Sequence, residues 1–421
     1  MLPGLVLSAV LAAQPAPAAP PGPLPPTPAP ALYQPAPTMP VSPAAYPPQQ
    51  MAPAAPPILR DTHLGPPDSF WVGGDYLLYW LKPAQVPLLV AGNRPGLPSV
   101  PVIGGREHEF GPADGGRLYI GTWLNDRHTL GVQASGFLLE QKSAFAAVNS
   151  GPGGSPQLVR PFLDALLARP AELLVSDPGL LAGGAFLATG SRLSGADLTV
   201  IRNIAYCPNY SFDFLAGGKY LDLDEYLAIT QVTRPIDGGV VVLDNVPYSG
   251  TGSVLTVADR FRTRNQFWGG VLGLRGEYRF GPAFVNLTVK GGVGNTRQEV
   301  DIDGFSAVSV AGVPRLPTGL LAVQGANNGR QVSNRLSVVS EVGAQVGVQV
   351  SRHLRVMIGY DLLYLESVAR PGDQIDPIVN PRLLPTSTSF RQVSGLTSPI
   401  RTRARDDWYA HGIRLGAQLQ Y

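Results

Sequence analysis

From residue 70 to residue 421, apolar and polar residues alternate along most of the chain with a period of two. This period predicts β-strands, because successive side chains of a strand point to opposite faces. The clearest stretch is 334–350, where the even positions are mostly Leu, Val or Ala and the odd positions are mostly small or polar. We therefore expect strands that have one apolar face and one polar face.

The pattern predicts about ten strands, with twelve as the alternative. The strands are expected at 70–82, 116–124, 128–146, 194–206, 210–231, 268–280, 284–294, 334–350, 354–364 and 409–421. Short and long connections alternate between them, and the long loops are expected at 83–115, 147–193, 232–261, 304–332 and 371–407. Outer-membrane barrels have short periplasmic turns and long extracellular loops, and an even strand count brings both termini to the periplasmic side. Within the second long loop, the segment 161–175 is expected to be a short helical or semi-apolar segment that folds into or over the barrel mouth.

The expected strand at 210–231 breaks the alternation near Gly217 and Gly218. A β-bulge at this point would restore the facing of the residues that follow. After such a bulge, Asp222 and Asp224 are expected to face the lumen. The apolar face would then carry Glu225 as a misfit among four aliphatic residues, which are Leu221, Leu223, Leu227 and Ile229.

The same period would occur in a soluble barrel, with the apolar face turned inward. Two features favour a membrane barrel instead. The polar face is rich in Gly, Gln, Asn and Ser with scattered charges of both signs, whereas a water-facing surface carries more Lys and Glu. Aromatic residues also gather near strand ends, as they do in the interface girdles of outer-membrane barrels. These aromatic residues are Trp71, Tyr79, Trp80, Trp268, Tyr278, Phe280, Trp408 and Tyr409.

The last predicted strand ends on an aromatic residue of the apolar face, Tyr421. We expect Tyr421 to present the C-terminal strand to the barrel-assembly machinery. The expected fold is all-β, a closed antiparallel transmembrane β-barrel over residues 70–421 that is surrounded by membrane lipid. Its expected location is the outer membrane of a bacterium with a double-membrane envelope.

The first part of the chain has a different composition. Residues 1–14 are apolar and then small, as in a secretory signal peptide, but a basic segment is missing. Either the true start lies upstream, or the segment is not a signal. Between residues 15 and 57, 18 of 43 residues are prolines, and no charged residue precedes Arg60. Residues 15–60 are therefore expected to form a Pro/Ala-rich disordered linker, which is either a plain tether or a periplasmic arm that touches the cell wall.

Charge and motif content exclude several functions. The 32 basic and 30 acidic residues give a formal net charge of +2, which offers no basic surface for nucleic acid. A single cysteine, Cys207, excludes an internal disulfide and a multi-cysteine zinc site. The five histidines have no metal-motif spacing, and no nucleophile or phosphate-loop motif lies in a suitable context. We therefore expect neither a cofactor nor enzymatic activity.

Three charged runs have an alternative interpretation. The acidic runs DLDE (222–225) and DQID (373–376) could bind calcium, which prefers carboxylate oxygens. We favour pairing with lumen arginines for the first run and solvated loop acids for the second. The basic run within 260–264 either meets lipopolysaccharide phosphates at the outer rim or is a simple cluster that precedes the sixth strand.

The ionisable residues of the polar faces are the best candidates for a functional site. Six acids and five bases nearly balance, and a ten-stranded bore is narrow. They could line a small passive channel for ions or small solutes. They could instead pair and plug the bore, leaving a structural or surface-display barrel whose loops bind partners. The lumen-lining candidates are Asp75, Arg117, Asp222, Asp224, Arg275, Glu277, Lys290, Glu341, Arg355, Asp361 and Arg414.

Six segments carry a resemblance to a known family. They are GDYLLYWLKP (74–83), GGRLYIGTWLNDRHTLGVQASGFLLE (115–140), AGGKYLDLDEYLAI (216–229), DRFRTRNQFWGGVLGLRGEYRFGPAF (259–284), SEVGAQVGVQVSRHLRVMIGYDLLYLESVARPGDQID (340–376) and HGIRLGAQLQY (411–421). These segments resemble the β-barrel porin family 7, and the resemblance spans about residues 70–421. It implies an outer-membrane β-barrel, and it brings no catalytic residue or cofactor with it.

Overall fold

The computed structural model describes residues 69–94, 97–393 and 395–421. The expected signal peptide at 1–14 and the expected linker at 15–60 lie outside the described residues. Among the residues described, no helix is long and apolar enough to cross a membrane. The helical content described is two short 3-10 turns, at Gly372–Gln374 and Pro381–Leu383.

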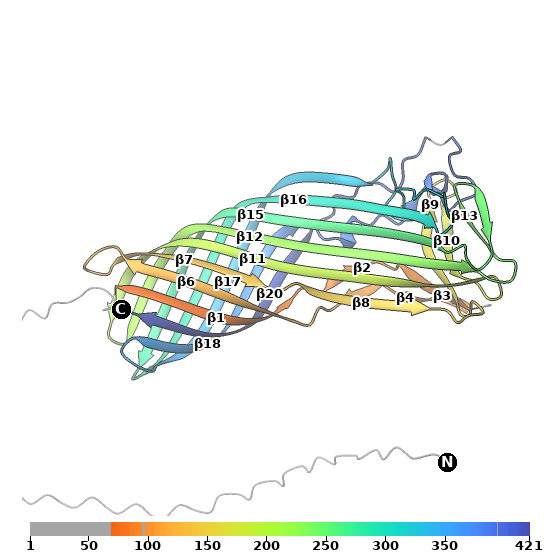
Figure 1. The fold of residues 1–421 in the computed structure, drawn as a ribbon. Helices are drawn as coiled ribbons and strands as arrows, with labels where there is room; N and C mark the ends of the chain where they lie inside the picture. The colour runs from red at the N-terminus through yellow and green to blue at the C-terminus, as the bar shows by residue number, and fades with distance from the viewer. Residues whose placement is uncertain (1–68, 95–96, 394) are drawn as a thin grey trace, which may run out of the picture. The chain divides into compact units, whose positions relative to one another are not determined.

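Ten strands form one closed antiparallel ring (Figure 1). In ring order they are β12 (Tyr210–Pro235), β15 (Leu255–Phe280), β16 (Ala283–Val308), β17 (Gly329–Gln349), β18 (Leu354–Val368), β20 (Asp406–Gln420), β1 (Phe70–Leu81), β6 (Pro112–Trp123), β7 (Leu130–Leu139) and β11 (Leu181–Cys207). Pairing of β11 with β12 closes the ring. The first and last strands also pair, and the backbone N–H groups of Ser69 and Phe70 donate to the Tyr421 carbonyl at 2.7 and 2.8 Å. The prediction of a ten-stranded all-β barrel is confirmed.

The apolar faces of the strands are the exposed ones. In β17 the even-numbered residues point outward, and Leu336 is 82% exposed. Leu118 of β6 and Val293 of β16 are 74% and 60% exposed. Exposing so large an apolar belt to water would be unfavourable, whereas the hydrocarbon core of a bilayer is apolar and can surround it. This observation separates a membrane barrel from a soluble one.

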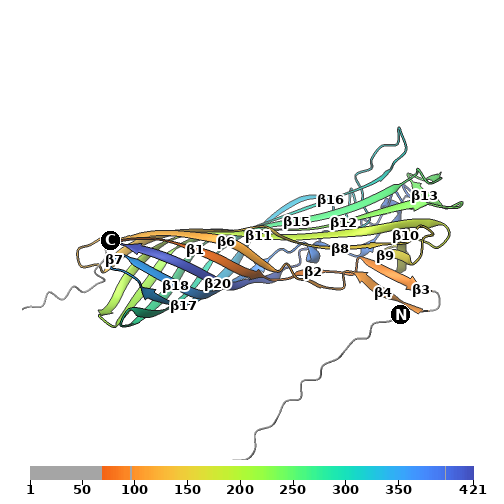
Figure 2. The same ribbon diagram turned by 60° about the horizontal axis from the view of Figure 1, so that its bottom comes forward.

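Several strands run well beyond this belt at the end away from the C-terminus (Figures 1 and 2). Strand β11 begins at Leu181 instead of 194, β15 begins at Leu255 instead of 268, and β16 ends at Val308 instead of 294. The expected loop boundaries at these three places are wrong. The basic run within 260–264 consequently lies inside β15, and it does not precede that strand.

The expected β-bulge at Gly217 and Gly218 is also wrong. The register of β12 against both β11 and β15 continues unbroken through these glycines. Odd-numbered residues of β12 face inward on both sides of them, with Asp213 6% exposed before the glycines and Lys219 4% and Glu225 2% exposed after them. What changes at this height is the surroundings of the two faces. Below it the outer face meets lipid and the inner face lines a polar space, whereas above it the outer face meets water and the inner face packs in an apolar core.

Several residues therefore face a different side from the one expected from the sequence. The four aliphatic residues that follow the glycines face the barrel interior, where none is more than 1% exposed; they are Leu221, Leu223, Leu227 and Ile229. Three aromatic residues expected in the interface girdles, Trp71, Tyr79 and Trp408, are buried inside the barrel as well. Trp268, Tyr278, Phe280 and Tyr409 do face outward, exposed by 62%, 55%, 52% and 37%.

The long loops contain further strands that cover the extracellular end. Strands β9 (Gln157–Asp164) and β10 (Arg169–Ser176) form a hairpin where a short helical or semi-apolar segment was expected at 161–175, and the helical alternative is wrong. The hairpin pairs with β3 (Val90–Arg94), which pairs with β4 (Leu97–Ile103), and β19 (Ile378–Val379) pairs with β9. Neighbouring short pairs are β2 (Ala84–Val86) with β5 (Arg106–His108) and β13 (Val240–Leu243) with β14 (Val246–Ser249), while β8 (Lys142–Asn149) pairs with the upper part of β11. We call the extracellular loops and these strands the cap.

The orientation of the barrel can be tested by labelling single cysteines in intact cells. With Cys207 replaced by Ser, we expect Val393→Cys, which is 93% exposed in the cap, to react with a membrane-impermeant maleimide. We expect Arg352→Cys, which lies in the turn before β18, to react only after the outer membrane is permeabilised. Labelling of Arg352→Cys in intact cells would show that the barrel has the opposite orientation.

Candidate functional site

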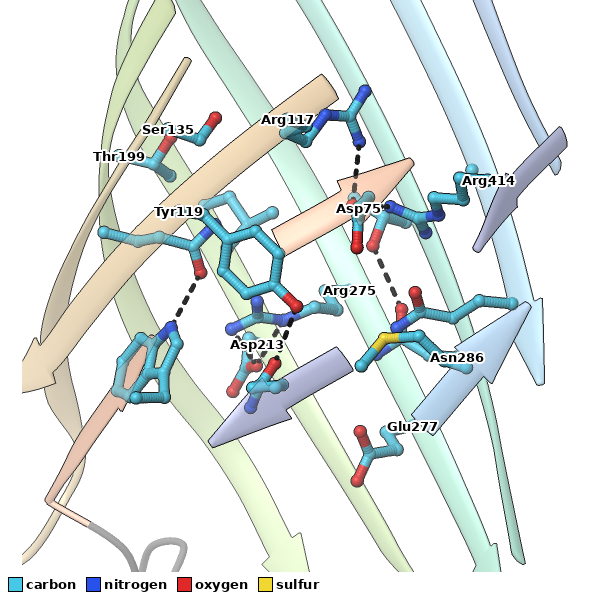
Figure 3. Close-up of a pocket in the computed structure, with 18 of the residues that line it drawn as sticks. Asp75, Arg117, Tyr119, Ser135, Thr199, Asp213, Arg275, Glu277, Asn286 and Arg414 are labelled. Atoms are coloured by element: carbon cyan, nitrogen blue, oxygen red, sulfur yellow. Dashed lines mark hydrogen bonds and ion pairs between the residues drawn. The ribbon is translucent and has the colours of Figure 1, made fainter. Parts of the chain in front are cut away.

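A cavity of about 640 Å³ occupies the periplasmic half of the barrel. Its wall reaches from the turn residue Arg352 up to Lys219 and Leu363. Figure 3 shows side chains from strands on several sides of the ring pointing into this space. The alternation of the strands produces this lining, because every second residue of each strand faces the lumen.

Nine of the eleven candidates named from the sequence lie on the cavity wall. They are Asp75, Arg117, Arg275, Glu277, Lys290, Glu341, Arg355, Asp361 and Arg414. The other two, Asp222 and Asp224, were expected in the lumen and instead point outward. On the outer surface Asp222 pairs with Arg264 at 2.6 Å, and Asp224 pairs with Arg262. The prediction is wrong for these two residues because it relied on the bulge that the strand does not have.

Five charged residues of the wall were missed, namely Asp197, Asp213, Lys219, Arg279 and Arg352. Unbroken alternation along β12 places Lys219 on the same face as Asp213, so the sequence contained the signal for both. Asp197 alternates with the exposed Leu198 in the same way.

Eight charged residues form a belt around the upper part of the cavity. Four acids and four bases contribute, from eight of the ten strands. We call this set the charge belt; it consists of Asp75, Arg117, Asp197, Lys219, Lys290, Glu341, Asp361 and Arg414. Its net formal charge is zero, so the belt has no overall preference for anions or cations.

Several contacts of the charge belt cross the bore between strands that are not neighbours in the ring. Lys219 of β12 bonds to Glu341 of β17. Arg117 of β6 lies 3.2 Å from Asp361 of β18, which also accepts a 2.7 Å hydrogen bond from the Tyr79 hydroxyl. Bonds that span the lumen narrow it, because each holds two side chains near its axis.

Above the charge belt the interior is filled by apolar side chains. We call this set the apolar layer. It belongs to a buried cluster to which nine of the ten ring strands contribute. A water-filled channel would leave side chains at this height exposed, yet each of the following is at most 1% exposed: Leu77, Leu193, Leu221, Leu223, Phe267, Val339, Leu365 and Trp408. The apolar layer therefore closes the bore between the cavity and the cap.

Two buried ion pairs hold the cap on the barrel. Arg370, which follows β18, donates to both carboxylate oxygens of Glu225 at 2.9 and 3.1 Å, and both side chains are 2% exposed. Next to it, the Asn265 side chain donates to the Ala369 carbonyl and accepts from the Ala369 N–H. Arg160 of β9 pairs with Asp259 of β15 at 2.6 Å, with both side chains at 0% exposure. Burial makes the loss of one partner of such a pair costly, because the remaining charge is left without compensation.

Acidic residues of the two runs that suggested calcium binding have other partners. Glu225 of the first run pairs inside the barrel, while its two aspartates pair outside. In the second run, Asp376 accepts backbone N–H bonds from Ile378 and Ile400. Within the described part of the chain, no group of three or more His, Cys, Asp or Glu residues is placed to hold a metal ion.

Asp373 of the second run is a partly buried titratable group of the cap. Burial, followed by repulsion from Asp406, raises the pKa of the Asp373 carboxyl above its ordinary range. A raised pKa in the folded state means that the cap is favoured while Asp373 is protonated, and that this contribution is lost as pH rises through the raised pKa. We expect hydrogen exchange in the cap, corrected for its intrinsic pH dependence, to reveal easier opening as pH rises above about 4.

The Asp373→Asn variant is the control for this pH effect. Its neutral amide cannot ionise, so the change in cap opening with pH should be smaller than in the wild type. An identical pH profile in the two proteins would contradict the role of Asp373.

Comparison with known proteins agrees with the architecture. A family model described as Putative beta barrel porin-7 (BBP7) matches residues 71–421. The chain belongs to this family. The resemblance found in the sequence is thus confirmed, and BBP7 membership places the barrel in the outer membrane of a Gram-negative bacterium. No curated protein matches the chain.

Solved outer-membrane proteins are more distant from this BBP7 chain. The outer membrane protease OmpT from Escherichia coli is 11% identical, with a TM-score of 0.38, and the alignment covers 84% of this chain and 97% of that one. The Pseudomonas putida toluene transporter TodX is 8% identical, with a TM-score of 0.19 and coverage of 85% and 91%. The activities of these proteins therefore do not transfer to the BBP7 chain.

Proposed function

We propose that this outer-membrane barrel is sealed, and that it serves as a structural and surface-display element whose cap binds partners outside the cell. The observation that carries the proposal is the apolar layer. A solute crossing the barrel would have to displace fully buried side chains such as Leu221, Phe267 and Trp408. Close-packed interiors of this kind resist such displacement.

The cap supports the second half of the proposal. Its loops are folded into paired strands and fastened by buried ion pairs such as Arg160–Asp259. Partner recognition benefits from such rigidity, because preordered loops lose less conformational entropy on binding. The proposal assigns the protein no catalytic step. It has membrane lipid around the barrel, and assembly proceeds through the C-terminal strand β20 and Tyr421, which follows it.

Passive passage of ions or small solutes is the second candidate function. The polar cavity favours it, since its wall carries charges of both signs over about 640 Å³. This function requires the apolar layer to open.

Liposome swelling distinguishes the two functions. Proteoliposomes containing the full chain should swell in a small sugar no faster than empty liposomes. A general porin reconstituted in parallel shows that the assay responds. Swelling by the wild-type barrel that approaches that of the porin would refute the sealed barrel and support passive passage.

A further inference from the structure

The lower part of the cavity differs from the charge belt in composition and in net charge. We call the part between the belt and the periplasmic turns the vestibule. Its charged wall residues are four arginines and two acids, an excess of two positive charges; they are Arg275, Arg279, Arg352, Arg355, Asp213 and Glu277. The periplasmic half of the lumen is therefore locally cationic, although the whole chain is nearly neutral.

One side of the vestibule is aromatic. Trp71 of β1 and Trp123 of β6 lie with ring centroids 5.6 Å apart, and Tyr119 packs in the same cluster with Ile201 and Leu215. A side chain at Gly121 would collide with the Trp71 ring, and one at Gly131 would collide with Trp123. These glycines leave room for the two indole rings, which are inclined by 56° to each other and both line the cavity.

Two arginines of β15, Arg275 and Arg279, lie on the opposite side, and Arg355 of β18 lies on the wall between that side and β1. In the ring order, β15 stands five positions from β1, so the wall with Arg275 lies across the bore from the wall with Trp71. The side chains of Arg275 and Arg355 are 24% and 17% exposed to the cavity, although each also has an acidic partner. Each guanidinium has five N–H donors, so a partner on one edge leaves other donors for a ligand.

We propose that the vestibule binds a small amphipathic anion that arrives from the periplasm. Its apolar body would pack against the aromatic wall, mainly against Trp123, and its carboxylate, sulfonate or phosphate group would face Arg275 and Arg355. A cavity of about 640 Å³ falls within the range of small-molecule sites, which combine an apolar wall with a few convergent polar groups. Access of the anion from the periplasm alone rests on the sealed barrel of the proposed function, whereas binding of the anion in the vestibule does not.

The test uses three probes of equal shape and different charge. Isothermal titration of the full chain in lipid nanodiscs, with empty nanodiscs subtracted, compares 2-naphthoate, neutral 2-naphthamide and cationic 2-naphthylmethylammonium. The anion should bind most tightly and the cation least tightly. Absence of binding, or equal affinity for all three probes, would overturn the proposal, and because titration does not measure passage, this failure is distinct from failure of the sealed barrel.

Two variants of one ion pair make the test specific. Arg275 and Asp213 are paired at 2.9 Å on neighbouring strands. Arg275→Gln should weaken 2-naphthoate binding roughly five- to tenfold, and Asp213→Asn should strengthen it by a similar factor. Binding of the neutral amide should change little in either variant. Shifts of the anion affinity in the same direction would contradict an electrostatic site.

The controls address folding and nonspecific charge. The double variant Arg275→Gln/Asp213→Asn restores the net charge of the vestibule but still lacks the Arg275 guanidinium, so it should bind the anion more tightly than Arg275→Gln and less tightly than the wild type. It leaves no unpaired charge, and it therefore keeps the test available if a single variant fails to fold. Arg297→Gln changes an exposed arginine on β16 outside the lumen and should leave all three affinities unchanged. An equal loss of anion binding in Arg297→Gln would assign the effect to overall charge and overturn the proposed site.

Discussion

Replacing Arg370 with Met is expected to lower the free energy of cap opening by about 3–5 kcal/mol, which raises hydrogen exchange in residues 369–405 by two to three orders of magnitude or more. The variant leaves the Glu225 carboxylate buried at 2% exposure without the guanidinium that donates to both of its oxygens. An unpaired charge in such a place either remains at high cost or draws in water. Both outcomes loosen the segment that follows β18.

The double variant Glu225→Leu/Arg370→Met is the matched control for this prediction. Replacing both members of a buried ion pair by apolar residues of similar size is often neutral or stabilising. We therefore expect the double variant to recover most of the protection that the single variant loses. If the single variant kept the exchange rates of the wild type, the pair would not fasten the cap.

Replacing Trp408 with Ala is expected to destabilise the barrel by about 3–5 kcal/mol, because it removes the largest fully buried side chain of the apolar layer. The measurement is urea-induced unfolding in detergent micelles, followed by the loss of heat-modifiable mobility on gels. The cavity left behind also lies directly in the path between the vestibule and the cap. The variant should therefore become permeable to ions while still folded.

The Trp408→Phe variant separates packing from hydrogen bonding. The Trp408 indole N–H is buried and has no hydrogen-bond partner in the described structure. Phe keeps most of the apolar volume and removes that unsatisfied donor, so its cost should be far below that of Ala. Equal destabilisation by Phe and Ala would show that the indole is held by something other than packing.

The sequence was sufficient to predict a ring of ten strands and nine of the lumen residues, but not the full length of the strands. Period-two alternation states which residues of a strand share a face, and it placed Asp75, Arg117 and Glu341 together on the inner wall. It does not state which face meets water, lipid or core. That choice depends on height along the barrel, which only the full length of β11, β12, β15 and β16 reveals.

The errors at 217–225 follow from this limit. The change from polar to apolar on one face was interpreted as a slip in register, whereas the register holds and the surroundings change. The hairpin at β9 and β10 could not be predicted for a related reason. Its residues contact barrel positions that are remote in sequence, as Arg160 contacts Asp259, and such tertiary contacts override a weak local pattern.

Single-channel recording in a planar lipid bilayer tests the sealed bore most directly. The wild-type chain should insert without producing conductance steps, and Trp408→Ala should produce them under the same voltage and salt. Absence of conductance in the wild type is informative only if insertion is verified independently, for example by co-flotation of the labelled protein with lipid. Stable conductance steps from the wild-type barrel would contradict the account.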